Sequence, residues 1–418
     1  MPAAPSDASA AAPEHRATLP LAGITVLDLG QVYQGPYACF LMARAGADVI
    51  KIEPPGGESV RARAAISRGS GAPFAMLNSN KRSLALDLKA EAGKEILRGL
   101  AASADVLLEN YAPGVMDRLG VGWEALSAIN PRLVYASGSG YGLSGPDAAN
   151  LAMDVTVQAA SGMMGVTGFP DGPPVKAGPA VADFLSGTHL YAGVMTALFE
   201  RERTGRGRLV EVAMQEAVYP SLASNLAVVF DEGRAPPRTG NRHGAMAAAP
   251  YNVYPCADGH VAIIGVTDGH WRALCAAMGR PELAEDPRFA AKVARVRRIE
   301  ETDAAVAEWT SARTRDEAVA ALRAGRVPCA PVRDLVEVTQ DPHMRGRGML
   351  FDIDHPEYGA LTVHGSPLRL HGAAAPDYVA SRPLGADGRA VLSEKLGLTE
   401  DALAALERDG VIGGAGED

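Results

Sequence analysis

Two aspartates lie in apolar surroundings, where a carboxylate needs a reason to be present. Asp154 lies in the segment AMDV, and Asp183 lies in the segment VADF, just before a stretch with helical spacing. An aspartate at a helix start can accept backbone N–H bonds as a cap, or it can act as a carboxylate nucleophile. The local pattern favours the cap for Asp183, and spacing alone does not choose between the two roles.

Two glycine patterns approximate nucleotide-binding turns. The segment from Gly140 to Gly145 matches G-x-G-x-x-G after a predicted strand, but Pro146 follows and no helix opens there. A dinucleotide fingerprint also needs an acid roughly 20 residues on, which is missing. The turn from Gly30 to Gly35, with Glu53 after the next strand, has suitable topology and the wrong glycine spacing. Both patterns favour plain glycine loops, and a nicotinamide-dependent dehydrogenase is kept as a remote alternative.

Other catalytic patterns find little support. No Gly-x-Ser-x-Gly elbow occurs, and no two of the nine histidines form His-x-His or His-x-x-x-His. His260 follows a predicted turn and is expected to be structural or exposed. The four cysteines include no Cys-x-x-Cys pair, so we predict no metal site and no disulfide framework. These cysteines are Cys39, Cys256, Cys275 and Cys329.

The composition is that of an ordinary soluble protein. Of the 418 residues, 47% are hydrophobic and 21% are charged, which suits two or three domains with apolar cores. A net charge of −9 argues against nucleic acid as a partner. Residues 1–18 are expected to be a disordered tail, with no signal peptide, and no run of about 18 apolar residues indicates a membrane span. We therefore expect a cytoplasmic protein.

Apolar runs alternate with helical spacing through the first half of the chain. Residues 24–29 are typical of a buried strand, 30–36 of a turn, 37–45 of a helix and 48–52 of a second strand. This β-α-β order implies parallel strands and an α/β sheet. The alternation continues in strands predicted at 83–87, 106–109, 133–137 and 208–214, and in helices predicted at 90–102, 151–165, 183–203 and 215–230.

The second half is organised differently. Residues 236–249 are rich in turn formers and are a candidate domain junction. Strands are expected near 251–255 and 261–264, followed by Arg- and Ala-rich helices as far as Leu322. From Pro331 the pattern is rich in loops and strands, and the chain ends in a helix predicted at 401–409.

Several separate blocks carry a resemblance to a known family. They are Leu27-Asp28 with Gly35-Pro36, GADVIKIE at 46–53, NKRS at 80–83, ENYAPG at 109–114, Ala182-Asp183, TGRG at 204–207 and Leu384-Gly385. On these blocks the chain resembles the class III coenzyme A transferases. That family includes formyl-CoA and carnitine CoA transferases and the α-methylacyl-CoA racemases. The resemblance runs from about Leu21 to Ile412, and it specifies the family better than the substrate.

The resemblance implies a fold and an assembly. The expected fold is α/β, with a large doubly wound, Rossmann-like domain built from both chain ends, residues 19–225 and 331–418. A smaller α+β domain is expected at 226–330. The family fold also implies an interlocked, ring-like homodimer, in which each subunit is threaded through a ring formed by the other.

The resemblance also implies a mechanism. The family's catalytic aspartate falls on Asp183, whose carboxylate is ionised at neutral pH and attacks the donor thioester without a base. An aspartyl-CoA thioester then carries the CoA to an acceptor acid. Coenzyme A and acyl-CoA are substrates, together with small carboxylic acids, and no permanently bound cofactor is expected. Oxyanion donors are needed, and backbone N–H groups in the loop from Gly240 to Gly244 are the candidates.

The family's CoA contacts carry over residue by residue. They fall on Gln31, Val32, Tyr33, Gln34, Leu86, Asn110, Val115 and Arg118. The Arg118 guanidinium suits bidentate binding of phosphate, although a surface salt bridge would equally explain this arginine. Where formyl-CoA transferase has a basic residue after the second strand this chain has Pro54, so Arg61 or Arg63 would have to supply the phosphate contact.

The racemase branch is the close alternative. It pairs the same aspartate with a histidine in a Gly-His-Asp sequence, and here Met153 stands at the histidine position and cannot move a proton. This favours transfer over racemisation. Substrate contacts are assigned weakly to Tyr33, Gln34, Asp154 and Gly244. Succinyl, mesaconyl, citramalyl, malyl and oxalyl groups all stay open as substrates.

Overall fold

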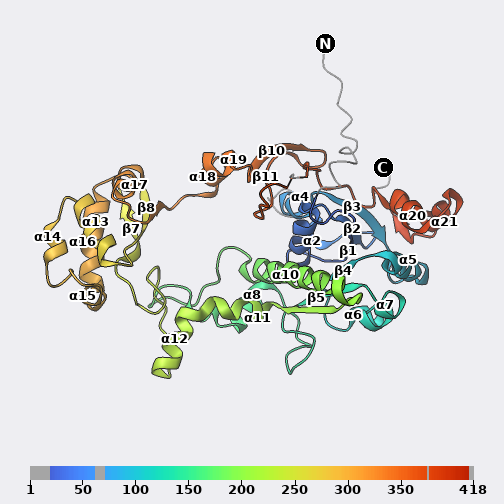
Figure 1. Ribbon diagram of the computed structural model, residues 1–418, viewed down its shortest axis with the longest axis horizontal. Helices are drawn as coiled ribbons and strands as arrows, with labels where there is room; N and C mark the ends of the chain where they lie inside the picture. The colour runs from blue at the N-terminus through green and yellow to red at the C-terminus, as the bar shows by residue number, and fades with distance from the viewer. Residues whose placement is uncertain (1–18, 62–70, 374–375, 414–418) are drawn as a thin grey trace, which may run out of the picture. The chain divides into compact units, whose positions relative to one another are not determined.

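The computed structural model describes residues 19–61, 71–373 and 376–413, and these form two compact units (Figure 1). The first unit contains the residues up to Val157, then Ala180–Val218, and then the residues from Pro342 onward. The second unit contains Gln158–Pro179 and Tyr219–Asp341. The first unit is therefore assembled from segments far apart in the sequence.

A seven-stranded sheet forms the centre of the first unit, with the strand order β12-β3-β2-β1-β4-β5-β6. Six strands are parallel, and β12 runs antiparallel to β3 at one edge. The order 3-2-1-4-5-6 is that of a doubly wound nucleotide-binding sheet. The strands are β1 (Thr25–Asp28), β2 (Asp48–Glu53), β3 (Lys81–Leu86), β4 (Val106–Glu109), β5 (Val134–Ser139), β6 (Leu209–Ala213) and β12 (Ile412–Gly413).

The sheet is buried on both faces because alternate residues of each central strand enter different apolar clusters. In β1, Val26 belongs to one cluster and Leu27 to the other, and Val49 and Ile50 of β2 divide in the same way. Such continuous apolar runs are typical of a parallel sheet that is covered on two sides. Helices α2 (Gln34–Arg44) and α10 (Val181–Thr204) contribute to one cluster. Helices α5 (Glu91–Ser103), α20 (Gly388–Leu396) and α21 (Glu400–Arg408) contribute to the other (Figure 1).

The other regular elements of the first unit follow the sheet in the chain or return to it. The helices are α2 (Gln34–Arg44), α4 (Ala72–Asn78), α5 (Glu91–Ser103), α6 (Val115–Arg118), α7 (Trp123–Ile129), α8 (Asp154–Ala160), α10 (Val181–Thr204), α11 (Met214–Val218), α19 (Pro342–Gly346), α20 (Gly388–Leu396) and α21 (Glu400–Arg408). Helix α8 continues into the second unit. A hairpin of β10 (Leu350–His355) and β11 (Gly359–His364) belongs to the returning segment.

The second unit has a three-stranded antiparallel sheet in the order β7-β8-β9, covered by helices that pack around Trp271. Its strands are β7 (Tyr251–Cys256), β8 (Gly259–Ile264) and β9 (Cys329–Pro331). Its helices are α9 (Met163–Val166), η1 (Tyr219–Leu222), α12 (Ala223–Glu232), α13 (Asp268–Ala277), α14 (Glu282–Glu285), α15 (Lys292–Arg297), α16 (Ile299–Ser311), α17 (Arg315–Ala324) and α18 (Leu335–Thr339). The long segment of the second unit runs from Tyr219 to Asp341, whereas the sequence predicts a small domain at 226–330. The expected domain bounds stay a prediction.

Three local expectations are wrong for identifiable reasons. The turn predicted at 30–36 ends earlier, because α2 begins at Gln34 and places Pro36 in its first turn, where proline is tolerated. The single helix predicted at 151–165 divides into α8 and α9 at Gly162, which has φ +87°. The region after Pro331 holds short helices such as α18, whose first turn is fixed by a capping box between Asp334 and Glu337.

None of the helices within the described residues is both long enough and apolar enough to cross a membrane.

Candidate active site

The doubly wound sheet has a topological switch point between β1 and β4. Gln31 follows β1 and Asn110 follows β4, and the two residues bond reciprocally. The Gln31 backbone N–H donates to Asn110 Oδ1 over 2.6 Å, and Asn110 Nδ2 donates to the Gln31 carbonyl over 3.0 Å. Ligands of open α/β sheets bind outside the carboxyl ends of the strands at such a point. The structure therefore brings two of the expected CoA residues together at a suitable place.

The backbone around Gln31 is fixed on both sides. The Gly30 N–H donates to Asp28 Oδ1 over 2.8 Å, and the Gly30 carbonyl accepts a bond from Lys51 Nζ. The Val32 N–H donates to Glu58 Oε2 over 2.8 Å. Three consecutive residues are thus held by side chains from outside the loop, so the loop is ordered without a ligand.

A buried ionic network lies beneath this loop. The strand register places Asp28 beside Lys51, and Lys81 Nζ lies 2.7 Å from Asp28 Oδ2. Lys81 also donates to the Pro36 carbonyl and to Asn78 Oδ1, both over 2.9 Å. Burial opposes the ionisation of Asp28, but Lys81 and Lys51 outweigh it and lower its pKa. Asp28 is therefore ionised at neutral pH although it is buried inside the unit.

Asp183 is the third residue of helix α10, and only 9% of its surface is exposed. The cap of this helix comes from a different aspartate, because the N–H groups of Ala182 and Asp183 donate to Asp154 Oδ2 over 2.8 and 3.2 Å. The preference of the local pattern for Asp183 as the cap is wrong, since the helix begins two residues earlier, at Val181. Asp154, the first residue of α8, takes that role.

The start of α10 packs against the segment Gln31–Gln34, which we call the switch-point loop, and against the start of α2. The Phe184 ring stacks with Tyr33 at a centroid distance of 6.0 Å and meets Tyr37 edge-on at 4.8 Å. One turn further along, a Cβ on Gly187 would lie 2.6 Å from the Gln34 carbonyl oxygen, so only glycine fits there. The segment that carries Asp183 and the segment Gln31–Gln34 therefore belong to one site.

Gln34 lies deep in this contact, with 2% of its surface exposed. Its side chain lies against Gly138 of β5, where a Cβ would approach the Gln34 amide to 2.7–2.9 Å. No described residue accepts a hydrogen bond from Gln34 Nε2. A buried donor without a partner is unfavourable, and it is available to a bound molecule. The glycines at 138 and 187 were not singled out by sequence, although a glycine inside a strand often marks such a close approach.

The remaining expected CoA residues do not all join this cluster. Leu86 ends β3, two strands away from β1, and its side chain is buried in the apolar core. Val115 and Arg118 lie in α6, after Asn110 in the chain. Arg118 is exposed, and no hydrogen bond or ion pair among the described residues engages its guanidinium. The surface salt bridge that would explain Arg118 structurally is thus not seen within the described chain.

Other expected positions have different outcomes. The Arg61 guanidinium forms a two-pronged contact with Glu53, so this side chain is used inside the fold. Arg63 lies outside the described residues. Gly244 belongs to the second unit, where a Cβ would lie 2.8 Å from Asn225 Nδ2, and its role near the substrate stays a prediction. In the described part of the chain, no three His, Cys, Asp or Glu side chains gather to hold a metal ion.

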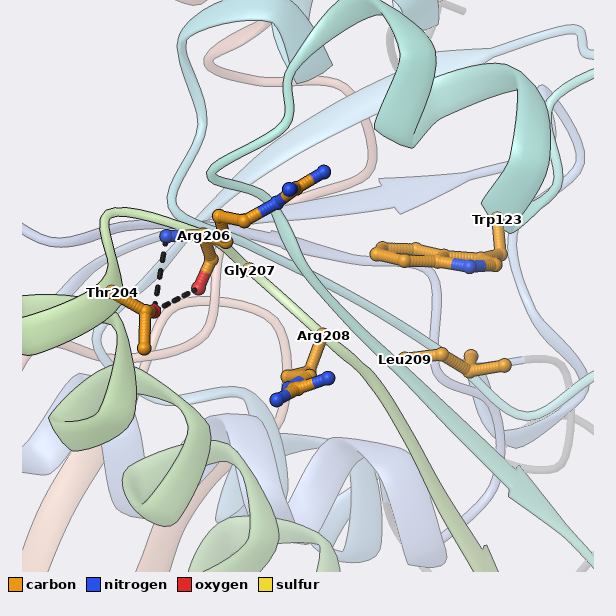
Figure 2. Close-up of a pocket in the computed structure, with 6 residues that line it drawn as sticks. All are labelled: Trp123, Thr204, Arg206, Gly207, Arg208 and Leu209. Carbon is orange, nitrogen blue, oxygen red and sulfur yellow. Dashed lines mark hydrogen bonds between the residues drawn. The ribbon is translucent and has the colours of Figure 1, made fainter.

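A cavity of about 530 Å³ in the first unit lies apart from the expected CoA residues. Figure 2 shows the Trp123 ring on one side of it and the Arg206 and Arg208 side chains on others; its lining is Trp123, Thr204, Arg206, Gly207, Arg208 and Leu209. Arg208 pairs with Glu200 at 2.6 Å. The cavity therefore lies at the β6 edge of the sheet, away from the switch point.

A smaller cavity of about 200 Å³ lies beside the segment that follows β4, and Glu109 is one of the residues that line it. Glu109 ends β4 with 5% of its surface exposed, and Oε2 accepts the Tyr111 N–H over 2.8 Å. Burial raises the pKa of Glu109 to about 7; the hydrogen bonds from Ser137 and from the Tyr111 backbone lower it in part, and the charge of Asp117 raises it further. In the sequence, Glu109 belongs to the family block at 109–114, and no local pattern indicates its raised pKa.

The raised pKa makes a prediction about stability. An acid whose folded pKa lies above its ordinary value of 4.5 stabilises the fold fully below pH 4.5, and this contribution is lost as the pH rises through about 7. The shift corresponds to roughly 3 kcal/mol. Glu109→Gln is neutral at every pH and keeps an oxygen for the Tyr111 N–H. We expect the melting temperature of the variant minus that of the wild type to increase from pH 5 to pH 8. Thermal scanning at constant ionic strength measures this difference.

The control for this measurement is Glu124→Gln, because Glu124 is an exposed carboxylate that lines the same cavity. Its melting temperature should follow that of the wild type across the pH range. A Glu109→Gln curve parallel to that of the wild type would contradict the raised pKa.

Comparisons with known proteins agree with the geometry. The family model described as CoA-transferase family III matches residues 21–388. The chain is 39% identical over 411 residues to a formyl-CoA:oxalate CoA-transferase of Streptomyces coelicolor, covering 94% of this chain and 99% of that protein. It is 38% identical over 359 residues to a succinyl-CoA:mesaconate CoA-transferase of Haloarcula marismortui, covering 83% and 89%.

A solved structure is also similar over most of the chain. A CAIB/BAIF family protein from Brucella suis superposes with a TM-score of 0.80 at 34% identity, covering 90% of this chain and all of that one. The mixed α/β fold with its large parallel sheet is thus shared with a solved relative.

Proposed function

We propose a reaction from this premise: the chain belongs to the CoA-transferase family III and is an enzyme of the CoA-transferase type. The proposed reaction moves CoA from an acyl-CoA donor to a short-chain carboxylic acid, with Asp183 as the covalent carrier. The observation that supports it is the contact between Phe184 and Tyr33, which brings the Asp183 segment to the switch-point loop. A nucleophile and a nucleotide-binding turn then share one site.

The first half-reaction loads the enzyme. A carboxylate oxygen of Asp183 attacks the thioester carbonyl carbon of the donor, the C–S bond breaks, and the CoA thiolate leaves. The product is a mixed anhydride between the donor acyl group and Asp183. The thiolate then attacks the Asp183 carbonyl carbon of this anhydride. The donor leaves as a free carboxylate, and CoA stays on Asp183 as a thioester.

The second half-reaction repeats these steps with the acceptor. The acceptor carboxylate attacks the aspartyl thioester and expels the CoA thiolate, which gives a second anhydride. The thiolate attacks the acceptor acyl carbon and regenerates the Asp183 carboxylate. Each step exchanges one activated acyl group for another, so no ATP is consumed. The N-terminal end of α10 favours a negative charge at Asp183, which supports its return as a carboxylate leaving group.

The acceptor class is proposed from two sources. The relatives from Streptomyces and Haloarcula are named for oxalate and mesaconate, which are both dicarboxylates. Among the residues that the structure describes, the buried Gln34 amide nitrogen has no acceptor, and it is suited to a carbonyl or carboxylate oxygen. We assign a short dicarboxylic or hydroxycarboxylic acid as acceptor, with Tyr33 and Gln34 on the substrate side and the exposed Arg118 binding a CoA phosphate.

Racemisation at the α-carbon is the alternative within this family. It would require a proton-transfer partner for Asp183 at the position of Met153, whose thioether cannot carry a proton. The neighbouring Asp154 is already engaged by two backbone N–H groups of α10. Both observations favour transfer.

The interlocked homodimer is part of the same proposal. A single copy exposes large apolar side chains, including Leu151 (82%), Phe199 (72%) and Phe230 (74%), and helix α12 has no buried residue. Exposed apolar area of this kind is typical of an interface. Light scattering after gel filtration should give the mass of two chains, and a stable single chain in solution would contradict the assembly. A cytoplasmic location stays a prediction.

The function is tested by a donor and acceptor screen. Succinyl-CoA, acetyl-CoA and formyl-CoA are each offered with a panel of short mono-, di- and hydroxycarboxylates, and new thioesters are identified by mass spectrometry. We expect a new acyl-CoA only when an acceptor acid is present. A parallel reaction in deuterated water without acceptor separates the alternatives, since deuterium at the α-carbon with no transfer would replace our proposal by the racemase.

A further inference from the structure

Val32 has a backbone conformation that its side chain disfavours. Its φ angle is +64°, which places a β-branched residue in the left-handed region. Residues held in this way are strained by about 1–3 kcal/mol, and they persist only when their surroundings fix them. Val32 lies in the centre of the switch-point loop, so something outside the loop must hold it.

Glu58 is the side chain that contacts Val32 most directly. Its Oε2 accepts the Val32 N–H over 2.8 Å, and its side chain is 1% exposed. A bond from a backbone N–H to an ionised carboxylate is stronger than one between neutral groups. The contact can therefore offset strain of the size expected for a left-handed valine.

Lys51 couples this contact to the other side of the loop. Lys51 Nζ lies 3.5 Å from Glu58 Oε1 and also donates to the Gly30 carbonyl. One buried ion pair thus holds the loop twice, by its anion at Val32 and by its cation at Gly30. Around it, the Glu58 N–H donates to Glu53 Oε2 over 3.1 Å, and Glu53 is bound by Arg61. Glu58 itself is therefore fixed by the fold before any ligand binds.

We propose that Glu58 is a positioning residue, which holds Val32 in the left-handed conformation and thereby preforms the Gln31–Gln34 loop that binds coenzyme A. The inference rests on the proposed function, because that function makes the loop a CoA site. Glu58 need not touch the substrate. Without Glu58, the loop would sample conformations that cannot bind CoA. The apparent affinity for CoA would then fall in proportion to the fraction of molecules whose loop is in the binding conformation.

The test compares coenzyme A binding and turnover in the full-length wild type, three variants and one control. Glu58→Ala should weaken the Kd for free CoA, by titration calorimetry, and raise KM for the acyl-CoA donor by about tenfold or more, with kcat changed little. Glu58→Gln keeps an oxygen for the Val32 N–H and should stay within about threefold of wild type. In the Glu58→Ala background, Val32→Gly removes the strain, because glycine accepts positive φ, and should recover most of the lost affinity.

Asp105→Ala is the matched control. Asp105 also accepts a backbone N–H over 2.8 Å, from Thr25, and pairs with Arg201 at 2.9 Å, but it lies at the other end of the strands. It should lower stability without changing KM. If Glu58→Ala raises KM no more than this control, or if Val32→Gly gives no recovery, the inference is overturned.

Two further outcomes keep the experiment decisive. If Glu58→Ala does not fold, Glu58→Asp replaces it, since it keeps the charge beside Lys51 but shortens the reach by one methylene. KM should then rise, and an unchanged KM overturns the inference. A wild-type protein that neither binds CoA nor transfers it would remove the proposed function instead. If the wild type binds and transfers CoA but the Glu58 variants behave like the wild type, only the positioning role is overturned.

Discussion

Asp183→Ala is expected to abolish CoA transfer, with kcat/KM reduced on the order of a thousandfold or more, as for other enzymes that lose a covalent nucleophile. The reaction has no other route in the proposal, because each transferred acyl group must pass through the Asp183 carboxylate. CoA binding should survive, since Asn110 and the Gln31–Gln34 loop are unchanged. Steady-state transfer assays combined with titration calorimetry separate the two effects.

Trapping gives a direct readout of the same prediction. Hydroxylamine added with acyl-CoA should attack the aspartyl thioester and convert Asp183 to a hydroxamate. Peptide mass spectrometry should then find one added NH group on the peptide that contains residue 183. A hydroxamate elsewhere, or transfer by Asp183→Ala at the wild-type rate, would remove Asp183 from the mechanism.

Asp154→Asn is the control for local charge. Its amide oxygen can still accept the N–H groups of Ala182 and Asp183, so the start of α10 should keep its structure. We expect this variant to retain measurable transfer and to form the hydroxamate on Asp183. If Asp154→Asn abolishes both, then the carboxylate at 154 takes part in the chemistry and is more than a cap.

Lys81→Met is expected to produce the largest loss of stability. Lys81 and Asp28 form an ion pair at 2.7 Å with side-chain exposures of 1% and 0%. Removing one partner leaves a buried charge without its main counterion, which is destabilising by about 3–5 kcal/mol. The Pro36 carbonyl and Asn78 Oδ1 also lose their donor. Chemical denaturation followed by circular dichroism measures the loss.

Two comparisons interpret this number. Lys94→Met makes the same substitution in a pair with Glu91 at 3.0 Å, whose side chains are 20% and 61% exposed, and it should change stability by less than about 1 kcal/mol. Adding Asp28→Asn to Lys81→Met removes the orphaned charge and should restore part of the loss. Equal losses of stability in Lys81→Met and Lys94→Met would show that the buried ion pair contributes no more to stability than the more exposed one.

The sequence predicts the sheet well because its information is local. The apolar run at 106–109 coincides with β4, and the β-α-β order of the first 52 residues agrees with β1, α2 and β2. Such runs need no knowledge of distant residues to be recognised. The role proposed for Asp183 rests on the family resemblance, since its local pattern indicates only a helix cap.

What the sequence could not predict depends on distant pairs. Asp154 caps α10 through Ala182 and Asp183, which lie 28 and 29 positions later in the chain. Lys81 meets Asp28 across a separation of 53 residues, and this contact depends on the order of non-consecutive strands. The short helices after Pro331 have too few turns for hydrophobic periodicity to be visible. The role of each of these residues can be recognised only once the tertiary fold is known.

The strand β12 has a consequence for how the protein is made. Ile412 and Gly413 pair with Leu86 and Ala85, the last two residues of β3, at one edge of the sheet. Ribosomes deliver chains from the N-terminus, so β3 is synthesised more than 300 residues before its partner. During that interval an apolar strand has an open edge, which invites pairing with other nascent chains. Chaperone protection during translation would therefore be needed most by the end of β3 that Ile412 and Gly413 cover.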